Sequence, residues 1–204
     1  MSSSAAVRRP LLIVVSAPSG AGKTTLCNRL TEARADIVRS VSCTTRSPRG
    51  AERNGRDYHF LSEAEFDRRL AEGAFLEHAC VHGHRYGTLR KTVEAAMRAG
   101  RSVVLAIDVQ GAAQIRAHVA AMPQSNPVRQ GHMDVFVEPP SLEALRRRLT
   151  GRGEDPAHVI EQRMRNAEAE MAERGAFRYR LVNDDLDRAS RELVALVDRE
   201  AGQA

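Results

Sequence analysis

Three continuous apolar runs stand out in a chain that is otherwise rich in charged residues. They cover residues 11–16, 103–107 and 135–137 and consist mostly of Leu, Ile and Val. Such runs are typical of parallel strands that are buried on both faces of a sheet. Helical spacing of apolar residues follows them, over residues 23–34, 111–121, 142–149 and 186–199. The alternation predicts an α/β fold in which helices cover both faces of a parallel sheet.

Two stretches interrupt this alternation. Residues 40–88 hold five of the eight Tyr and Phe residues, and short strands with one helix fit this stretch best. Residues 145–165 are dense in arginine, and Gly151, Gly153 and Pro156 break their helical pattern. We therefore expect a single domain over residues 11–204, with a core of residues 11–39 and 89–204, an inserted subdomain at about 40–88, an arginine-rich lid at about 148–165 and a disordered segment at 1–10.

The composition is that of a globular protein and argues against membrane proteins and nucleic-acid-binding proteins. The chain has 204 residues, of which 42% are hydrophobic and 28% charged, as is ordinary for a globular protein. No apolar stretch approaches the roughly 18 residues that span a bilayer, so we expect no membrane association. The net charge of +5 arises from basic residues scattered among Asp and Glu, which favours a small polyanion over nucleic acid as the partner. Only two of the 31 basic residues are lysine, Lys23 and Lys91.

The N-terminus gives no sign of a signal peptide, and the cysteines favour a reducing compartment. Arg8 and Arg9 precede an apolar run, but this run is too short for a signal peptide and merges into the loop described next. Cys27, Cys43 and Cys80 form neither a CxxC pair nor an even framework, so they indicate no metal site and no disulfide pattern. We expect a cytoplasmic protein.

The strongest motif lies between the first predicted strand and the first predicted helix and reads Ser16-Ala17-Pro18-Ser19-Gly20-Ala21-Gly22-Lys23-Thr24. The glycines let the backbone curl so that amide groups and the helix N-terminus face phosphate oxygens. In such a loop Lys23 bridges the terminal phosphates and the Thr24 hydroxyl reaches Mg²⁺, which predicts ATP binding with Mg²⁺ as cofactor. Ala17 replaces the glycine that usually begins the motif, and a structural turn that happens to carry Gly-Lys-Thr is the alternative reading.

An acidic residue at the end of a later strand is the usual partner of such a loop. Asp108 ends the run of residues 103–108 and is the candidate. A helix-capping aspartate is the alternative, because apolar strands that end in Asp are common.

Motifs spread over residues 11–200 resemble those of guanylate kinases. They occur in family order as Ser40–Glu52, Asn54–Phe60, Phe75-Leu76-Glu77, Tyr86-Gly87-Thr88, Ile107–Gly111, Arg148–Gly153 and Val182–Leu186. The resemblance implies a P-loop NTPase-type core with a GMP-binding subdomain. It also implies an enzyme that uses Mg²⁺ and transfers a phosphoryl group from ATP to GMP, in guanine nucleotide synthesis and recycling.

The resemblance assigns Arg46, Arg49, Tyr58 and Tyr86 to the GMP phosphate. The residue types suit this task, because guanidinium groups donate paired hydrogen bonds to phosphate and tyrosine hydroxyls add further donors. A solvated loop whose arginines neutralise charge is the alternative.

Glu77 is expected to select guanine, because one carboxylate accepts hydrogen bonds from both N1–H and N2–H of that base. Adenine would leave a buried carboxylate unpaired, a mismatch that gives roughly 10⁴ to 10⁵ discrimination. By resemblance, Ser42 and Thr88 assist with the base, and Asp108 lies near both the base and Mg²⁺. A surface glutamate on a short strand is the alternative.

The resemblance also assigns arginines to a lid that closes over ATP. In phosphoryl transfer such residues stabilise charge on the equatorial oxygens, and the closed lid excludes water. The predicted catalytic residues are Lys23, Arg46, Arg148, Arg152 and Arg163. The predicted ATP-binding residues are Ala17, Pro18, Ser19, Gly20, Ala21, Gly22, Lys23, Thr24 and Asn183, the last near the adenine.

The chain departs from the family pattern at three places. Ala106 stands two residues before Asp108, where many members carry Asp. The turn Gly50-Ala51-Glu52 differs in order from the more usual x-Gly-Glu. The segment 122–132 is longer than the usual connection and rich in Pro, Gln and Asn, so we expect an exposed insertion there.

Two other functions are weighed against this one. Guanylate-kinase-like domains without catalysis serve as protein-interaction modules, but they typically lose phosphate-loop residues, whereas this chain keeps Lys23, Thr24, Arg46 and Arg49. Phosphorylation of another small anion is disfavoured by Glu77 together with the paired tyrosines. ATP and GMP are therefore the expected partners, and no sequence pattern indicates an oligomeric state.

Overall fold

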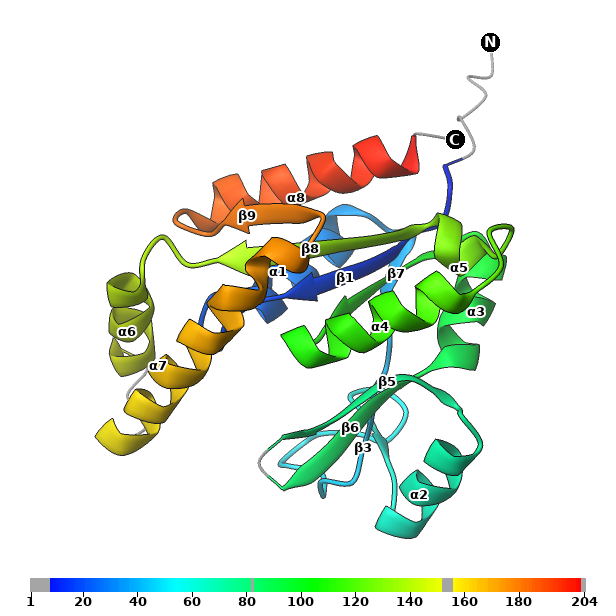
Figure 1. The fold of residues 1–204 in the computed structure, drawn as a ribbon, viewed down its shortest axis with the longest axis horizontal. Helices are drawn as coiled ribbons and strands as arrows, with labels where there is room; N and C mark the ends of the chain where they lie inside the picture. Colours follow the sequence, from blue (N-terminus) through cyan, green and yellow to red (C-terminus); the bar gives the residue numbers. More distant parts are fainter. Residues whose placement is uncertain (1–7, 82, 152–155, 203–204) are drawn as a thin grey trace.

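The computed structural model describes residues 8–81, 83–151 and 156–202, and a five-stranded sheet lies at its centre (Figure 1). Its strands run in the order β2 (Ile37–Arg39), β7 (Ser102–Ala106), β1 (Leu12–Ser16), β8 (His132–Glu138) and β9 (Tyr179–Val182). Every pair of neighbours is parallel, which confirms the predicted sheet. The three predicted runs are β1, β7 and β8, whereas β2 and β9 were not predicted.

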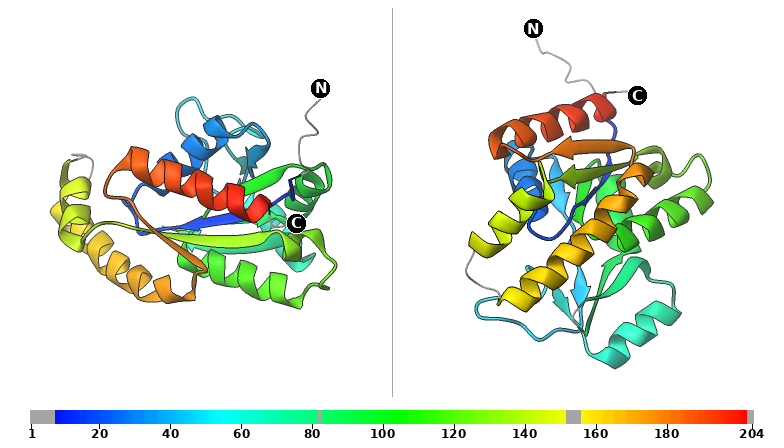
Figure 2. Two further views of the ribbon diagram at one scale, coloured as in Figure 1. Left: turned by 90° about the horizontal axis from the view of Figure 1, so that it is seen from above. Right: turned by 60° about the vertical axis from the view of Figure 1, so that its left-hand side comes forward.

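Two separate apolar clusters cover the two faces of this sheet. Ile13 and Val15 of β1 point into a cluster with α1 (Lys23–Ala33) and α8 (Leu186–Ala201). Leu12 and Val14 point the other way, into a cluster with α3 (Arg90–Arg98) and α4 (Val109–Ala121). Figure 2 shows α8 and α4 on opposite sides of the strands. The alternation of strand side chains thus buries β1 on both faces, as its continuous apolar run predicts.

A second, smaller sheet lies beside the core on the side of α4 (Figure 1). Its order is β4 (His59–Phe60), β3 (Cys43–Thr44), β6 (His84–Leu89) and β5 (Phe75–Val81). Helix α2 (Glu63–Ala71) packs against it through Phe66, whose ring stacks on Phe75 with centroids 4.5 Å apart. The region of residues 40–88 therefore contains short strands and one helix.

Two helices extend beyond the carboxyl ends of the central strands. They are α6 (Leu142–Gly151) and α7 (Ala157–Ala172), and a short 3₁₀ turn, η1 (Glu173–Ala176), leads from α7 to β9. The predicted lid at about 148–165 falls on the end of α6 and the first half of α7. Arg152, one of the predicted lid residues, lies outside the described residues.

The segment of residues 122–132 is only partly exposed, in contrast to the prediction. It contains the short helix α5 (Pro127–Gln130), which Asn126 caps by accepting a hydrogen bond from the Val128 amide. Val128 is buried and packs with α3 and α4. One apolar residue in a polar segment therefore anchors the connection to the core.

The N-terminus of the described chain lies beside the end of α8 (Figure 1). Arg8 and Arg9 fall in the segment predicted to be disordered, yet the Arg9 amide donates to the Ala201 carbonyl at 3.0 Å and Arg8 pairs with Asp198 at 2.9 Å. Within the part of the chain that the structure describes, no helix combines the length and the apolar character needed to cross a membrane.

Candidate functional site

The predicted site residues gather at the carboxyl edge of the central sheet. The loop of residues 17–22 follows β1, Asp108 follows β7 and Asn183 follows β9. From β1 the chain crosses to β2 on one side of the sheet, and after β7 it crosses to β8 on the other. Ligands of open parallel sheets bind at such a reversal of strand order, outside the carboxyl ends of the strands. The topology therefore directs attention to the loop after β1.

The loop after β1 is shaped to expose backbone amides. Gly20 and Gly22 have φ values of 92° and 96°, which suit glycine and few other residues. Gly22 is the N-cap of α1 and has no side chain to occupy the amides of the first turn. Ala17 belongs to the apolar cluster beneath the loop and is 2% exposed. An alanine at this position therefore adds a core contact, which accounts for the departure from the usual glycine.

Lys23 is turned toward the end of β7 in this structure. Its Nζ donates to the Ile107 carbonyl at 3.0 Å, and the Ser16 hydroxyl donates to the same oxygen at 3.0 Å. Burial lowers the pKa of Lys23, whereas the negative charges of Glu170 and Asp108 act in the opposite direction. The ammonium group is thus partly desolvated, and its hydrogen bond goes to a neutral backbone carbonyl. This arrangement suits a group that binds phosphate oxygens.

The loop is braced by the residues predicted for ATP and the lid. Asn183 donates from Nδ2 to the Ala21 carbonyl at 2.8 Å, and Arg148 donates to the Asn183 carbonyl at 2.8 Å. Arg163 of α7 reaches the loop and donates to the Ser19 hydroxyl at 3.3 Å. Arg148 of α6, Arg163 of α7 and Asn183 in the segment after β9 therefore lie together with the phosphate loop.

Gly22→Ala is expected to lower both thermal stability and ATP affinity. The left-handed backbone costs an alanine about 1–2 kcal/mol. A methyl group at this position would also lie 2.3 Å from Asn183 Nδ2 and would displace the amide that braces the loop. Thermal unfolding with and without ATP measures both effects.

Gly100→Ala is the matched control for Gly22→Ala. Gly100 has φ 75°, and a methyl group there would meet none of the described residues within 4 Å. We expect a similar conformational cost but unchanged ATP affinity. Equal ATP affinity of Gly22→Ala and Gly100→Ala would show that Asn183 does not brace the loop for the nucleotide.

A cluster around Arg46 contains three of the four residues predicted for the GMP phosphate. Arg46 is 7% exposed, its guanidinium lies 5.4 Å from the centre of the Tyr58 ring, and the Tyr58 and Tyr86 rings are 6.0 Å apart. Hydrogen bonds to Glu52 and to the Tyr86 hydroxyl raise the pKa of Arg46, which fixes its positive charge. Arg49 is exposed and joins the cluster through its backbone amide, which donates to Glu52 at 2.8 Å.

Glu52 was predicted only as part of a turn, but it holds this cluster together. One carboxylate oxygen accepts from Arg46 at 2.9 Å and the other accepts from the Arg49 amide. The same contacts lower the pKa of Glu52, first of all the hydrogen bond from Arg46. The order Gly50-Ala51-Glu52 therefore still places the Glu52 carboxylate in contact with the side chain of Arg46 and the backbone amide of Arg49.

Glu77 is a buried carboxylate at the junction of the two sheets. It is 4% exposed on β5 and accepts from the Thr88 hydroxyl at 2.6 Å. The pKa of Glu77 is raised to about 7, chiefly by burial and also by the charge of Asp108, while the hydrogen bond from Thr88 acts in the opposite direction. Cys43 lies opposite Gly87 in the small sheet, which places Ser42 next to Thr88. The surface alternative for Glu77 is therefore wrong.

Asp108 is the N-cap of α4 and accepts from the Gly111 amide at 2.8 Å. The capping alternative is thus correct, but the cap uses one of the two carboxylate oxygens of Asp108. A methyl group on Gly111 would lie 2.9 Å from Glu77 Oε2 and 3.4 Å from Asp108 Oδ1, so both carboxylates flank this glycine. Glu77 and Asp108 are therefore brought together from different sheets.

Glu170 is a site residue that sequence reasoning missed. Its Oε2 atom is buried and accepts no hydrogen bond from the described residues. Burial raises the pKa of Glu170, while the charge of Lys23 lowers it. Four glutamates lie between residues 161 and 173, and the sequence offers no signal that separates the one beside the phosphate loop.

The fold and the loop define an α/β P-loop protein that binds a nucleotide. The family model for guanylate kinase matches residues 8–200. A guanylate kinase of Anaeromyxobacter dehalogenans is 50% identical over 98% of this chain and 86% of that protein, and one of Thiobacillus denitrificans is 47% identical over 91% and 84%. The crystal structure of guanylate kinase from Anaplasma phagocytophilum superposes with a TM-score of 0.74 at 31% identity, covering 97% of this chain and 89% of that one. The chain belongs to the guanylate kinase family.

Proposed function

We propose that this chain transfers the terminal phosphoryl group of ATP to GMP, giving ADP and GDP. An oxygen of the GMP phosphate attacks the γ-phosphorus, the bond from that phosphorus to the bridging oxygen breaks, and ADP leaves. The observation that carries the proposal is the burial of Glu77 next to Thr88 and Asp108. A buried carboxylate is costly unless it meets hydrogen-bond donors, and guanine offers two that are adjacent.

The acceptor half of the site is proposed to lie in the subdomain of residues 40–88. Arg46, Tyr58 and Tyr86 form the phosphate cluster, with Arg49 at its exposed rim. When GMP binds, its phosphate competes with Glu52 for the Arg46 guanidinium. Ser42, Thr88 and Glu77 then hold the base, and Asp108 lies between the base and the phosphate loop.

The donor half is proposed to be the loop of residues 17–24 with its braces. The backbone amides of the loop and the ammonium of Lys23 bind the phosphates of ATP. Arg148 and Arg163 lie at the loop and supply positive charge to the transferring group, and Asn183 fixes the loop backbone. We assign Arg152 to the same lid on the sequence resemblance alone.

The residues at this edge fit Mg²⁺, the ion that accompanies ATP. Within residues 8–81, 83–151 and 156–202, no three His, Cys, Asp or Glu side chains are placed to hold a metal together. Mg²⁺ is usually held by one or two protein oxygens, phosphates and water, so a full protein cage is not required. Thr24 is exposed at the start of α1, and the carboxylates of Asp108 and Glu170 lie near Lys23. When bound, the ion would neutralise phosphate charge, with Thr24 as its protein ligand.

We also place this reaction in the cytoplasm. Cys27, Cys43 and Cys80 are all free thiols, and Cys80 is exposed. Free cysteines suit a reducing compartment.

Turnover assays with different acceptors test the proposed function. With ATP as donor, we expect GMP to be phosphorylated with a kcat/KM roughly 10⁴-fold above that for AMP, because AMP leaves Glu77 unpaired. ADP release is measured with GMP, dGMP, AMP and no acceptor. Turnover without a preference for guanine would reject GMP as the substrate, and ADP release that needs no acceptor would indicate an ATPase.

A further inference from the structure

Helix α4 and strand β5 lie against each other, and they carry the two carboxylates of the proposed GMP site. Glu77 belongs to β5, whereas Asp108 is the N-cap of α4. Helix α4 packs on the central sheet, and β5 is part of the small sheet. The position of Glu77 relative to Asp108 is therefore set by how β5 is held on α4.

Gln114 of α4 holds the backbone of β5 directly beside Glu77. Its Oε1 atom accepts from the His78 amide at 3.0 Å, and its Nε2 atom donates to the His78 carbonyl at 2.8 Å. In the described part of the chain β5 is the last strand of the small sheet, so its outer backbone groups meet no further strand. The side-chain amide of Gln114 takes the place of a neighbouring strand at this one residue.

Leu76, on the other side of Glu77, ties β5 to the core. The pairing of β5 with β6 shifts between Phe75 and Glu77, and such bulges often re-aim side chains next to active sites. Leu76 is 1% exposed and belongs to the apolar cluster that also contains Ala112 and Ile115 of α4. Glu77 therefore lies between two residues that are both held on α4, one by its side chain and one by its backbone.

The contacts along α4 follow the order of the residues along β5. Gly111 lies against Glu77: a methyl group there would be 2.9 Å from Glu77 Oε2, so the glycine leaves the space that this carboxylate occupies. Gln114 lies three residues later on the same side of the helix and bonds His78. Close approach at Gly111 and a directional contact at Gln114 together define where β5 lies on the helix.

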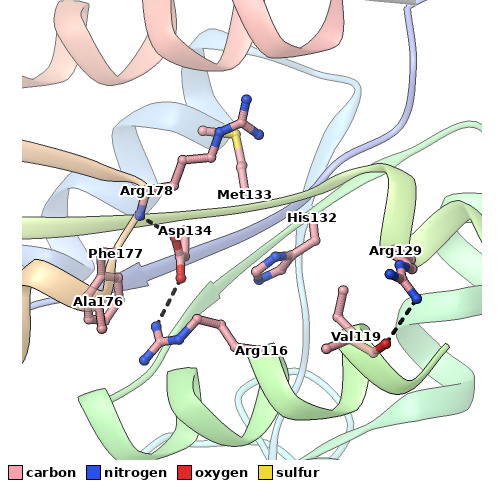
Figure 3. Close-up of a pocket in the computed structure, with 10 residues that line it drawn as sticks. Arg116, Val119, Arg129, His132, Met133, Asp134, Ala176, Phe177 and Arg178 are labelled. Atoms are coloured by element: carbon pink, nitrogen blue, oxygen red, sulfur yellow. Dashed lines mark hydrogen bonds and ion pairs between the residues drawn. The ribbon is translucent and has the colours of Figure 1, made fainter. Parts of the chain in front are cut away.

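Helix α4 is itself fixed to the central sheet by Arg116. In the hollow shown in Figure 3, Arg116 extends from α4 to Asp134 of β8, to which it donates at 2.9 Å. Its guanidinium also lies 4.7 Å from the centre of the Phe177 ring, and Asp134 is 3% exposed. Sliding or turning α4 would leave the buried Asp134 carboxylate without its charged partner, which is costly. The helix thus gives β5 a fixed support.

We propose that Gln114 is a positioning residue for the acceptor base: by holding the His78 backbone, it fixes the Glu77 carboxylate where N1–H and N2–H of guanine meet it. The inference rests on the proposed function, because it requires that Glu77 binds guanine. Gln114 acts through Glu77 and does not touch the nucleotide. Paired hydrogen bonds from one base edge to one carboxylate tolerate little displacement, because hydrogen bonds weaken steeply away from their preferred geometry.

Gln114→Leu tests this role, because it keeps a side chain of similar size and removes both hydrogen bonds. His78 is exposed, so water can satisfy its backbone groups and the fold should survive. We expect kcat/KM for GMP to fall by about tenfold, chiefly through KM, while KM for ATP stays unchanged, since only the guanine contact is misplaced. Gln124→Leu makes the same change in the exposed turn before α5 and should leave both constants at the wild-type values.

The double variant separates positioning from a general structural role. When Glu77→Gln is already present, Gln114→Leu should lower kcat/KM for GMP by less than about twofold, because the carboxylate that Gln114 positions is gone and coupled residues are not additive. A full tenfold effect in the Glu77→Gln background would show that Gln114 merely supports the subdomain, and the proposal would be wrong. Unchanged kinetics of the single variant would also overturn it.

Hydrogen exchange in the wild type tests the contact without any variant. Backbone groups two residues apart on a strand face the same edge, so the amides of His78 and Cys80 both face away from β6. We expect a protection factor for His78 at least about tenfold above that for Cys80, because Gln114 accepts from the His78 amide. Equal protection would overturn the proposal even if Gln114→Leu does not fold. The wild-type preference for GMP over AMP is measured in parallel, since its absence would reject the proposed function itself.

Discussion

Lys23→Ala is expected to lower kcat by about two to three orders of magnitude while the protein stays folded. The ammonium supplies charge where negative charge builds up on the transferring group, and removing one such donor has an effect of this size in other enzymes. The fold should survive, because the Ile107 carbonyl that accepts from Lys23 also accepts from the Ser16 hydroxyl. Steady-state turnover and a thermal unfolding curve measure the two effects separately.

The chain itself offers a matched control for Lys23→Ala. Lys91, the other lysine, is exposed on α3. Lys91→Ala removes the same charge and the same side chain, and we expect its turnover to equal that of the wild type. If Lys23→Ala kept wild-type turnover, the loop would bind the nucleotide through its backbone alone, and the catalytic role of the lysine would be refuted.

The parts of the fold that the sequence predicted are those that local pattern determines. The apolar runs of β1 and β7 are buried on both faces, and such burial leaves a continuous signal. Strand β2 has three residues and β9 has four, each with an exposed arginine, so neither forms an apolar run. These two strands exist because a neighbour in the sheet supplies their hydrogen bonds, which no local pattern records.

The same distinction applies to the site. The phosphate loop is contiguous, so spacing alone predicted Gly20, Gly22 and Lys23. Glu170 is 147 positions from Lys23, and only the packing of α7 brings the two together. Ala106, where many family members carry Asp, packs against the apolar cluster of the core and brings no second carboxylate to Asp108.

Glu77→Gln is expected to make the ligand-free protein more stable at pH 8 while it lowers kcat/KM for GMP. Because the folded-state pKa of Glu77 is about 7, against an ordinary value of 4.5, its ionised form destabilises the fold at high pH. The difference of about 2.5 units corresponds to about 3 kcal/mol, which a neutral glutamine would recover. A raised pKa contributes stability below pH 4.5 that is lost as the pH rises through 7. The gain from Glu77→Gln should therefore be large at pH 8 and small at pH 5, as measured by urea unfolding.

The loss of activity in Glu77→Gln follows from the same carboxylate. Two hydrogen bonds to a charged acceptor contribute about 3–6 kcal/mol together, so kcat/KM for GMP should fall by about 10² to 10⁴ while KM for ATP changes little. In the wild type, KM for GMP should rise as the pH falls below 7, because protonation removes the acceptor; in Glu77→Gln this dependence should disappear. Glu32→Gln, an exposed change at the far end of α1, should leave stability and kinetics as they are. Equal losses for GMP and ATP would make Glu77 a structural residue, whereas higher stability at pH 8 with a selective loss of GMP use would show that its burial is maintained for the base.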